Sequence, residues 1–142
     1  MCGIHEFSKE KIQNKTNSLL KDFRLEDIKD KKSQHLSGGY QRRLSIAMAL
    51  IGEPQVLFLD EPSLGLDVIS RSELREIIKS LKKKLTIILT THYMEEAEYL
   101  ADRIGIMKDG KMIVTGSVDE IKNISSKNTF VDAFISFTKE EK

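Results

Sequence analysis

Two adjacent carboxylates, Asp60 and Glu61, directly follow four apolar residues at positions 56–59. An apolar run without alternation is typical of a strand buried on both faces of a parallel sheet. In open α/β sheets, ligands bind beyond the carboxyl ends of the strands. There, one acid can hold Mg²⁺, often through water, while the other orients or deprotonates an attacking water. The plainer interpretation is a loop that opens with Asp-Glu-Pro, but a run of apolar residues leading straight into two acids favours chemistry.

A second candidate is an anion site at residues 36–40, which read Leu-Ser-Gly-Gly-Tyr before an expected helix. Gly38 and Gly39 let the backbone approach a ligand closely, and Ser37 can add a hydroxyl donor. The helix N-terminus directs unpaired N–H groups and a positive dipole end at the same place, which suits a terminal phosphate. Taken alone, the pattern is more often an ordinary helix cap.

Two further polar residues, Asp67 and His92, are weak signals singly. An aspartate before a helix is usually an N-cap. His92 follows Thr90-Thr91 after a second apolar run, and it is either a helix-entry residue or a hydrogen-bonding partner of a terminal phosphate or an attacking water. Each interpretation depends on the whole constellation.

The order of these residues resembles that of the motifs in the ATP-binding domain of ABC transporters. Residues 36–40 resemble the signature motif and residues 60–61 the end of the Walker B motif, while Asp67 resembles the D-loop aspartate and His92 the switch histidine. The resemblance covers nearly the whole chain. It implies that ATP and Mg²⁺ are the cofactors. Residue 40 is tyrosine where the commonest signature has glutamine.

The resemblance implies a role for each acid and for the histidine. Asp60 would serve Mg²⁺ through water, Glu61 would be the catalytic base, and His92 would be the switch. Because the family is an ATPase family, the implied reaction is ATP hydrolysis coupled to transport.

The same resemblance implies the nucleotide contacts. Ser37, Gly38 and Gly39 would contact the γ-phosphate of ATP held by an opposite subunit, and Asp67 would communicate across that dimer. The implied partners are a second ABC ATPase subunit, as a homodimer or heterodimer, and transmembrane permease subunits, at the cytoplasmic face of a membrane. Residues 91–98, 101–104 and 115–117 resemble the drug- and multidrug-exporter branch.

The phosphate-binding P-loop, G-x-x-x-x-G-K-[ST], is not found among the 142 residues. Residues 105–112 come near it, but Met112 has no hydroxyl for Mg²⁺, and residues 113–115 continue as a strand rather than a helix. Asp109-Gly110 is better explained as a hairpin turn. We therefore expect roughly the final three-fifths of an ABC domain, aggregation-prone or marginally stable and without MgATP turnover by itself, since proximity to a held phosphate would be lacking.

The predicted fold is α/β: a partial P-loop-NTPase-like ABC ATPase fold, with a parallel β core, flanking helices and part of the helical subdomain. Residues 1–51 would be the remainder of that subdomain, ending in the signature helix, and residues 52–142 the C-terminal part of the ATPase core, together one domain. Apolar spacing and turn signals predict helices at 8–24, 68–81 and 93–101, strands at 56–59, 85–89, 103–108 and 111–115, and a loop at 25–35.

Three helical details follow from the side-chain pattern. The signature helix would bury Leu44, Ala47, Met48 and Ile51 and end before Pro54, while the helix at 68–81 would bury Leu74, Ile77, Ile78 and Leu81. Ser117 and Glu120 form a capping-box pattern, and a final helix would carry a stripe of Phe130, Ala133, Phe134 and Phe137.

Composition narrows the functional classes. A net charge of +1 implies no strong attraction to nucleic acid or acidic membranes, and the lone Cys2 cannot form an internal disulfide, which fits a reducing cytoplasm. No run approaches the length of a membrane span. Two alternatives stay open: a non-catalytic partner or inactive remnant that supplies only the signature face to another ATPase, and a soluble ABC protein of translation or chromosome maintenance. The latter usually has tandem domains or long coiled coils, which do not occur here.

Overall fold

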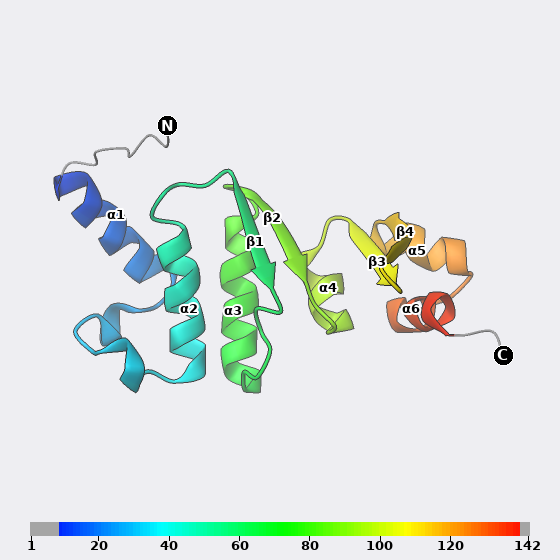
Figure 1. Cartoon of the computed structure of the whole chain (residues 1–142), viewed down its shortest axis with the longest axis horizontal. Coiled ribbons are helices and arrows are strands. Elements are labelled where there is room, and N and C mark those ends of the chain that lie inside the picture. Colours follow the sequence, from blue (N-terminus) through cyan, green and yellow to red (C-terminus); the bar gives the residue numbers. More distant parts are fainter. Residues whose placement is uncertain (1–8, 140–142) are drawn as a thin grey trace. The chain divides into compact units, whose positions relative to one another are not determined.

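The computed structural model describes residues 9–139, which form both helices and strands (Figure 1). The elements in order are α1 (Lys9–Asp22), the 3₁₀ helices η1 (Glu26–Ile28) and η2 (Ser33–His35), α2 (Gly38–Ala49), β1 (Val56–Asp60), α3 (Val68–Leu81), β2 (Thr86–Thr90), α4 (Met94–Leu100), β3 (Ile104–Lys108), β4 (Lys111–Gly116), α5 (Val118–Ser125) and α6 (Phe130–Thr138). Within the described range, no helix is long and apolar enough to cross a bilayer.

The chain divides into two compact units, Met1–Thr90 and Thr91–Lys142. This boundary separates two groups of residues that each contact mainly one another. The expected boundary after residue 51 instead separates the helical subdomain from the ATPase core of the family's domain. The partition at 51 stays a prediction, and residues 1–8 of its first part lie outside the described range, as does the first residue of the helix expected at 8–24.

The first unit contains a parallel pair of strands, as predicted. β1 pairs with β2 in a register that runs from Val56 opposite Thr86 to Asp60 opposite Thr90. α3 connects the two strands and has the predicted bounds, Val68–Leu81. Its buried face consists of the four predicted residues, Leu74, Ile77, Ile78 and Leu81. The α/β fold class with a parallel β core and flanking helices is therefore confirmed.

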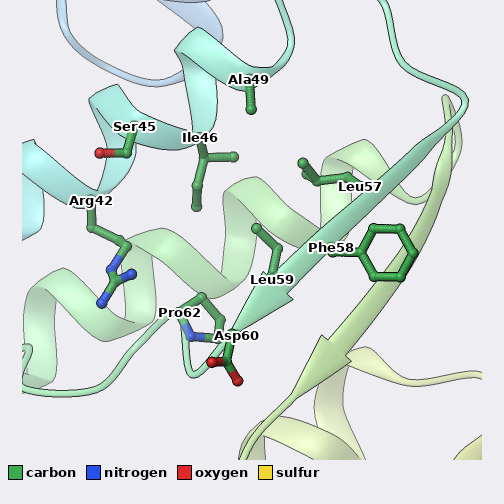
Figure 2. A pocket seen from close by; sticks show the side chains of 9 residues that line it. All are labelled: Arg42, Ser45, Ile46, Ala49, Leu57, Phe58, Leu59, Asp60 and Pro62. Carbon is green, nitrogen blue, oxygen red and sulfur yellow. The ribbon is translucent and has the colours of Figure 1, made fainter.

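The two faces of this sheet differ, which corrects the expectation that both would be buried. Leu57 and Leu59 are buried, whereas Phe58 is 72 % exposed and Val56 and Ile88 are also exposed. Figure 2 shows Leu57 and Leu59 leaving β1 on the side of α2, and Phe58 leaving on the opposite side. Because strand side chains alternate between faces, one covered face buries only every second residue.

The buried face of α2 differs from the predicted one. Ala47 is buried, but Met48 and Ile51 are 60 % and 43 % exposed. The buried positions include Gly39 and Arg43 instead. The prediction was wrong because hydrophobic spacing cannot detect a helix face made partly of a glycine and an arginine.

The stretch at 25–35 is not a simple loop. It forms the 3₁₀ helices η1 and η2, with Leu25 and Ile28 buried. Three-residue 3₁₀ turns carry no detectable apolar period, so sequence spacing missed them.

The second unit forms as predicted. β3 and β4 are antiparallel, and Asp109 and Gly110 between them have φ values of +49° and +74°, the left-handed pair that a tight hairpin turn requires. The near P-loop match therefore lies in a hairpin. The Ser117–Glu120 capping box begins α5. Ile106, Ile121, Phe130 and Ala133 form the core of this unit, with Phe134 and Phe137 packed against it among other partly buried apolar residues.

Candidate functional site

The carboxylate of Asp60 is exposed at the end of β1 and is held by the neighbouring strand. The parallel register places Thr90 opposite Asp60, and the Thr90 hydroxyl donates a hydrogen bond to Asp60 Oδ1. This bond orients the carboxylate. Sequence reasoning missed Thr90, although pairing the two predicted strands end to end would have identified it.

Glu61 adopts an unusual backbone conformation immediately beyond the strand. Its φ is +44°, in the left-handed region that a non-glycine residue rarely occupies. The Glu61 N–H donates to the Thr90 carbonyl at 3.0 Å, which secures this conformation. Strained residues of this kind cost on the order of 1–3 kcal/mol and concentrate at functional sites. The Glu61 side chain is half-buried, next to the exposed Asp60.

The N-terminus of α2 is open to solvent at Ser37 and Gly38. Ser37 is the N-cap residue, yet its side chain makes no capping hydrogen bond. The first N–H groups of a helix have no acceptor within the helix. The hydroxyl of Ser37 is thus not used as an ordinary cap, and the exposed turn has the donors that an anion needs.

The two glycines of this turn have different surroundings. A Cβ on Gly39 would lie 2.5 Å from Ser70 Oγ and 2.8 Å from Ser70 Cβ, so the absence of a side chain lets α2 pack against α3. A Cβ on Gly38 would meet only Leu66 Cδ2, at an ordinary 3.8 Å. Close helix packing is therefore a sufficient structural reason for Gly39, whereas the space beside Gly38 could accept a small side chain.

Asp67 caps α3. Its Oδ1 accepts hydrogen bonds from the N–H groups of Ile69 and Ser70, both at 3.0 Å. The backbone and then the side chain of Ser70 lower the pKa of the Asp67 carboxyl below its ordinary value of 3.8. The N-cap interpretation is therefore confirmed, and communication across a dimer stays a prediction.

His92 belongs to the second unit and follows the end of β2 by two residues. It is exposed, and its ring packs on Tyr93 with centroids 4.1 Å apart and a tilt of 38°. Its role as a switch stays a prediction.

The remaining candidates share one edge of the first unit. Figure 1 shows α2 and α3 side by side and parallel, both beginning at the end toward which β1 and β2 point. The Ser37–Gly39 turn, Asp60, Glu61 and Asp67 are all at the starts of these helices or at the end of β1. In an open α/β sheet this is the edge where ligands bind.

A groove of about 300 Å³ lies between α2 and β1, mostly with apolar walls (Figure 2). It is lined by Arg42, Ser45, Ile46, Ala49, Leu57, Phe58, Leu59, Asp60 and Pro62. The guanidinium of Arg42 and the carboxylate of Asp60 both lie toward the Pro62 end of the groove (Figure 2). Ser37, Gly38 and Gly39 do not line it, so the groove and the predicted phosphate contact are separate features.

Known proteins are similar to this chain in both sequence and fold. The ABC transporter family model matches residues 3–64. ABC transporter A family member 8 of Arabidopsis thaliana is 53 % identical over 96 residues, which is 68 % of this chain and 11 % of that protein. ABC transporter A family member 11 of Dictyostelium discoideum is 42 % identical over 116 residues, which is 82 % of this chain and 14 % of that protein.

Solved structures agree along nearly the whole chain. An ATP-binding subunit of an ABC transporter superposes with a TM-score of 0.78 at 28 % identity, over 95 % of this chain and 57 % of that one. This chain belongs to the ABC transporter ATP-binding domain family. CbiO1 of Clostridium perfringens, part of the transporter complex CbiONQ, matches with a TM-score of 0.75 at 31 % identity over 88 % of this chain and 53 % of its own. The ABC chain thus spans about a tenth of its curated relatives and just over half of these structures.

The donor set of this ABC domain fits the way Mg²⁺ is bound with nucleotides. No cluster of three or more histidine, cysteine or acidic side chains that could hold a metal occurs within residues 9–139. Mg²⁺ at nucleotide sites usually takes one or two carboxylates, with water and phosphate oxygens completing the shell. The exposed Asp60 carboxylate, oriented by Thr90, suits that role.

Proposed function

We propose that this chain is part of the ATP-binding subunit of an ABC transporter, which couples ATP hydrolysis to transport across a membrane. The observation that carries the proposal is the shared edge: α2 and α3 both begin on the side of the first unit toward which the carboxyl end of β1 points (Figure 1). Helix N-termini favour phosphate, and paired acids suit Mg²⁺ and an attacking water.

In this proposal the residues divide the work. Ser37, Gly38 and Gly39 contribute hydroxyl and N–H donors to the γ-phosphate of ATP held by a second subunit, as the family resemblance implies. Asp60 takes part in holding Mg²⁺, through water, which would neutralise phosphate charge. Glu61 orients or deprotonates the attacking water, which requires a phosphate within reach.

Asp67 and His92 have separate proposed roles. The Asp67 carboxylate, which accepts hydrogen bonds from two N–H groups at the start of α3, would communicate across the dimer. His92, exposed beyond β2, would act as the switch toward the γ-phosphate. The proposed partners are a second ABC ATPase subunit and membrane permease subunits, with the chain at the cytoplasmic face of the membrane. The proposed relationship to the exporter-like branch rests on residues 91–98, 101–104 and 115–117.

The alternative function is a non-catalytic partner that supplies only the Ser37–Gly39 face to another ATPase. It is favoured by the exposed turn at Ser37 and Gly38. A turn that contacts ATP held by a facing subunit needs no P-loop of its own.

The first experiment tests the phosphate contact through Gly38. The chain is mixed with the intact ATP-binding subunit of the same transporter, and association is measured by titration with MgATP and with MgADP. Gly38→Asp should abolish the gain due to MgATP, because its carboxylate repels the γ-phosphate, while an acid in the first turn does not weaken the helix. Gly38→Ala is the matched control, since the site has room for a methyl group. A gain that persists in Gly38→Asp contradicts the contact.

A second measurement separates the two functions. Glu61→Gln keeps the shape of the side chain and removes the base, so it should lower MgATP turnover by the mixture if the chain is catalytic. Unchanged turnover, together with a gain that Gly38→Asp abolishes, would identify the non-catalytic partner.

A further inference from the structure

Arg43 is a buried cation in α2, one turn after Gly39, with only 5 % of its surface exposed. Its Nη1 lies 3.3 Å from Glu73 Oε2 of α3 and donates to the Phe23 carbonyl at 3.5 Å. Its Cζ lies 4.4 Å from the centroid of the Tyr40 ring. Because burying an unpaired charge is costly, the Arg43–Glu73 pair is a structural tie between the two helices.

The tie adds to the close contact one turn earlier. Gly39 packs against Ser70, and Arg43 then pairs with Glu73, so two successive turns of α2 are matched to two places on α3. This matched spacing keeps the helices parallel and sets their relative height. The helix starts are thereby held at one level, with the Ser37 turn beside the Asp67 turn.

Tyr40 extends this arrangement to η1. Its hydroxyl donates to Asp27 Oδ2 at 2.6 Å, and its ring lies beside the Arg43 guanidinium. The first turn of α2 is therefore held on two sides, by η1 and by α3. Tyrosine, which differs from the commonest signature residue at this position, serves here as a stacking surface and a hydrogen-bond donor.

We propose that Arg43 and Glu73 are positioning residues that hold the Ser37–Gly38 donor turn and the Asp67-capped turn as one rigid edge. The pair fixes the height of one helix start against the other, so that a ligand held at the first turn of α2 also constrains the start of α3. The proposal rests on the proposed function for the identity of that ligand. The coupling between the starts of α2 and α3 requires no ligand and can be tested on the chain alone.

Glu73 offers a matched control within the same cluster. Its Oε1 lies 3.5 Å from Nη1 of Arg24, whose side chain is 58 % exposed, whereas that of Arg43 is 6 % exposed. Exposed ion pairs contribute little because water screens them, whereas losing Glu73, whose side chain is itself 32 % exposed, would leave the buried Arg43 charge uncompensated. Arg24→Gln therefore removes a cation from the same carboxylate without disturbing the buried tie.

The first test is hydrogen exchange of the chain without nucleotide. Glu73→Gln should speed exchange of the hydrogen-bonded amides of Gln41 in α2 and of Ile69 and Ser70 in α3 about tenfold, because local opening of the helix starts no longer breaks the Arg43–Glu73 pair. Arg24→Gln should change these rates by less than about twofold. Arg43→Lys keeps the positive charge but loses the planar guanidinium, so its exchange rates should lie between those of the unaltered chain and Glu73→Gln. It is also the variant to measure if Glu73→Gln fails to fold. Rates in Glu73→Gln and Arg43→Lys that equal those of the unaltered chain overturn the coupling.

The second test is the association assay described for Gly38. Glu73→Gln should weaken association in MgATP about tenfold and leave association in MgADP unchanged. An equal loss in both nucleotides indicates general destabilisation and overturns the positioning role. If Gly38→Asp abolishes the MgATP gain but Glu73→Gln changes neither exchange nor affinity, the positioning inference alone fails. If Gly38→Asp has no effect while exchange changes as expected, the proposed function fails and the coupling stands.

Discussion

The two compact units bury their apolar residues in different ways. In Thr91–Lys142, the hairpin and helices α5 and α6 enclose a core in which Phe130 is 2 % exposed. In Met1–Thr90, the β1–β2 sheet has one covered face and leaves Phe58 72 % exposed on the other. A hairpin with neighbouring helices completes its core from nearby residues, whereas a parallel sheet needs cover on both faces. The candidate site lies at the edge of the sheet that has the open face.

The largest expected effect contrasts two phenylalanines. Phe130→Ala should lower the free energy of unfolding by about 3–5 kcal/mol, because it opens a cavity in a closed core. Phe58→Ala should cost less than about 1 kcal/mol, since little surface leaves water at that position. Denaturant titration, with hydrogen exchange to assign each loss to its unit, measures both. Similar costs for the two substitutions would show that the open face is covered in solution.

A medium effect tests how the first unit is assembled. Gly39→Ala should cost about 1–3 kcal/mol, because the new methyl group overpacks against Ser70. Gly38→Ala should be nearly neutral, and Ser70→Gly should recover part of the loss in Gly39→Ala by removing the side chain that clashes. Thermal unfolding of the single and double variants measures this. Equal costs at Gly38 and Gly39 would contradict the close contact between α2 and α3.

The smallest effects compare a helix cap in each unit. Ser117→Ala should cost about 1 kcal/mol and lose the capping box of α5. The cap of α3 should instead depend on pH. The folded-state pKa of Asp67 lies below its ordinary value of 3.8, so its stabilisation is fully present above that value and is lost as pH falls through the lowered folded pKa.

This pH dependence can be measured by comparing the free energies of unfolding of the unaltered chain and Asp67→Asn from about pH 6 to about pH 2. The advantage of aspartate should shrink at the acid end, since asparagine caps without titrating. A difference that stays constant over the whole range would show that the carboxylate charge plays no part in the cap.

Local patterns predicted the elements of the fold well. The bounds of α3 and its buried stripe follow from helical spacing, and the turn at Asp109 and Gly110 follows from the left-handed backbone that a tight hairpin requires. The buried face of α2 could not be predicted in this way. Its contact with α3 uses Gly39 and Arg43, which no hydrophobic pattern marks, and the short turns of η1 and η2 have no period to detect.

The candidate site shows the same division. Asp60, Glu61 and the Ser37–Gly39 turn could be selected from the sequence because their chemistry depends on residue type and on position next to a strand or helix. The structure showed that the Thr90 hydroxyl bonds to Asp60, a contact that strand pairing alone could have suggested, and that Gly39 packs on Ser70, which nothing in the sequence indicated. Neither contact is local: Asp60 and Thr90 are 30 positions apart.

The sequence by itself determined which residues are candidates for polar chemistry, where most helices and strands lie, and that the two strands of the first unit pair through a connecting helix. These properties depend on short-range signals, namely apolar periodicity, turn residues and caps. The tertiary structure decided which face of each element is covered, which glycine is a packing residue, and that Arg43 meets Glu73 beneath the helix starts. Those outcomes depend on the relative height and rotation of packed helices. Contacts between residues far apart in the sequence, such as the Gly39–Ser70 contact and the Arg43–Glu73 ion pair, set this geometry, and local sequence patterns do not reveal it.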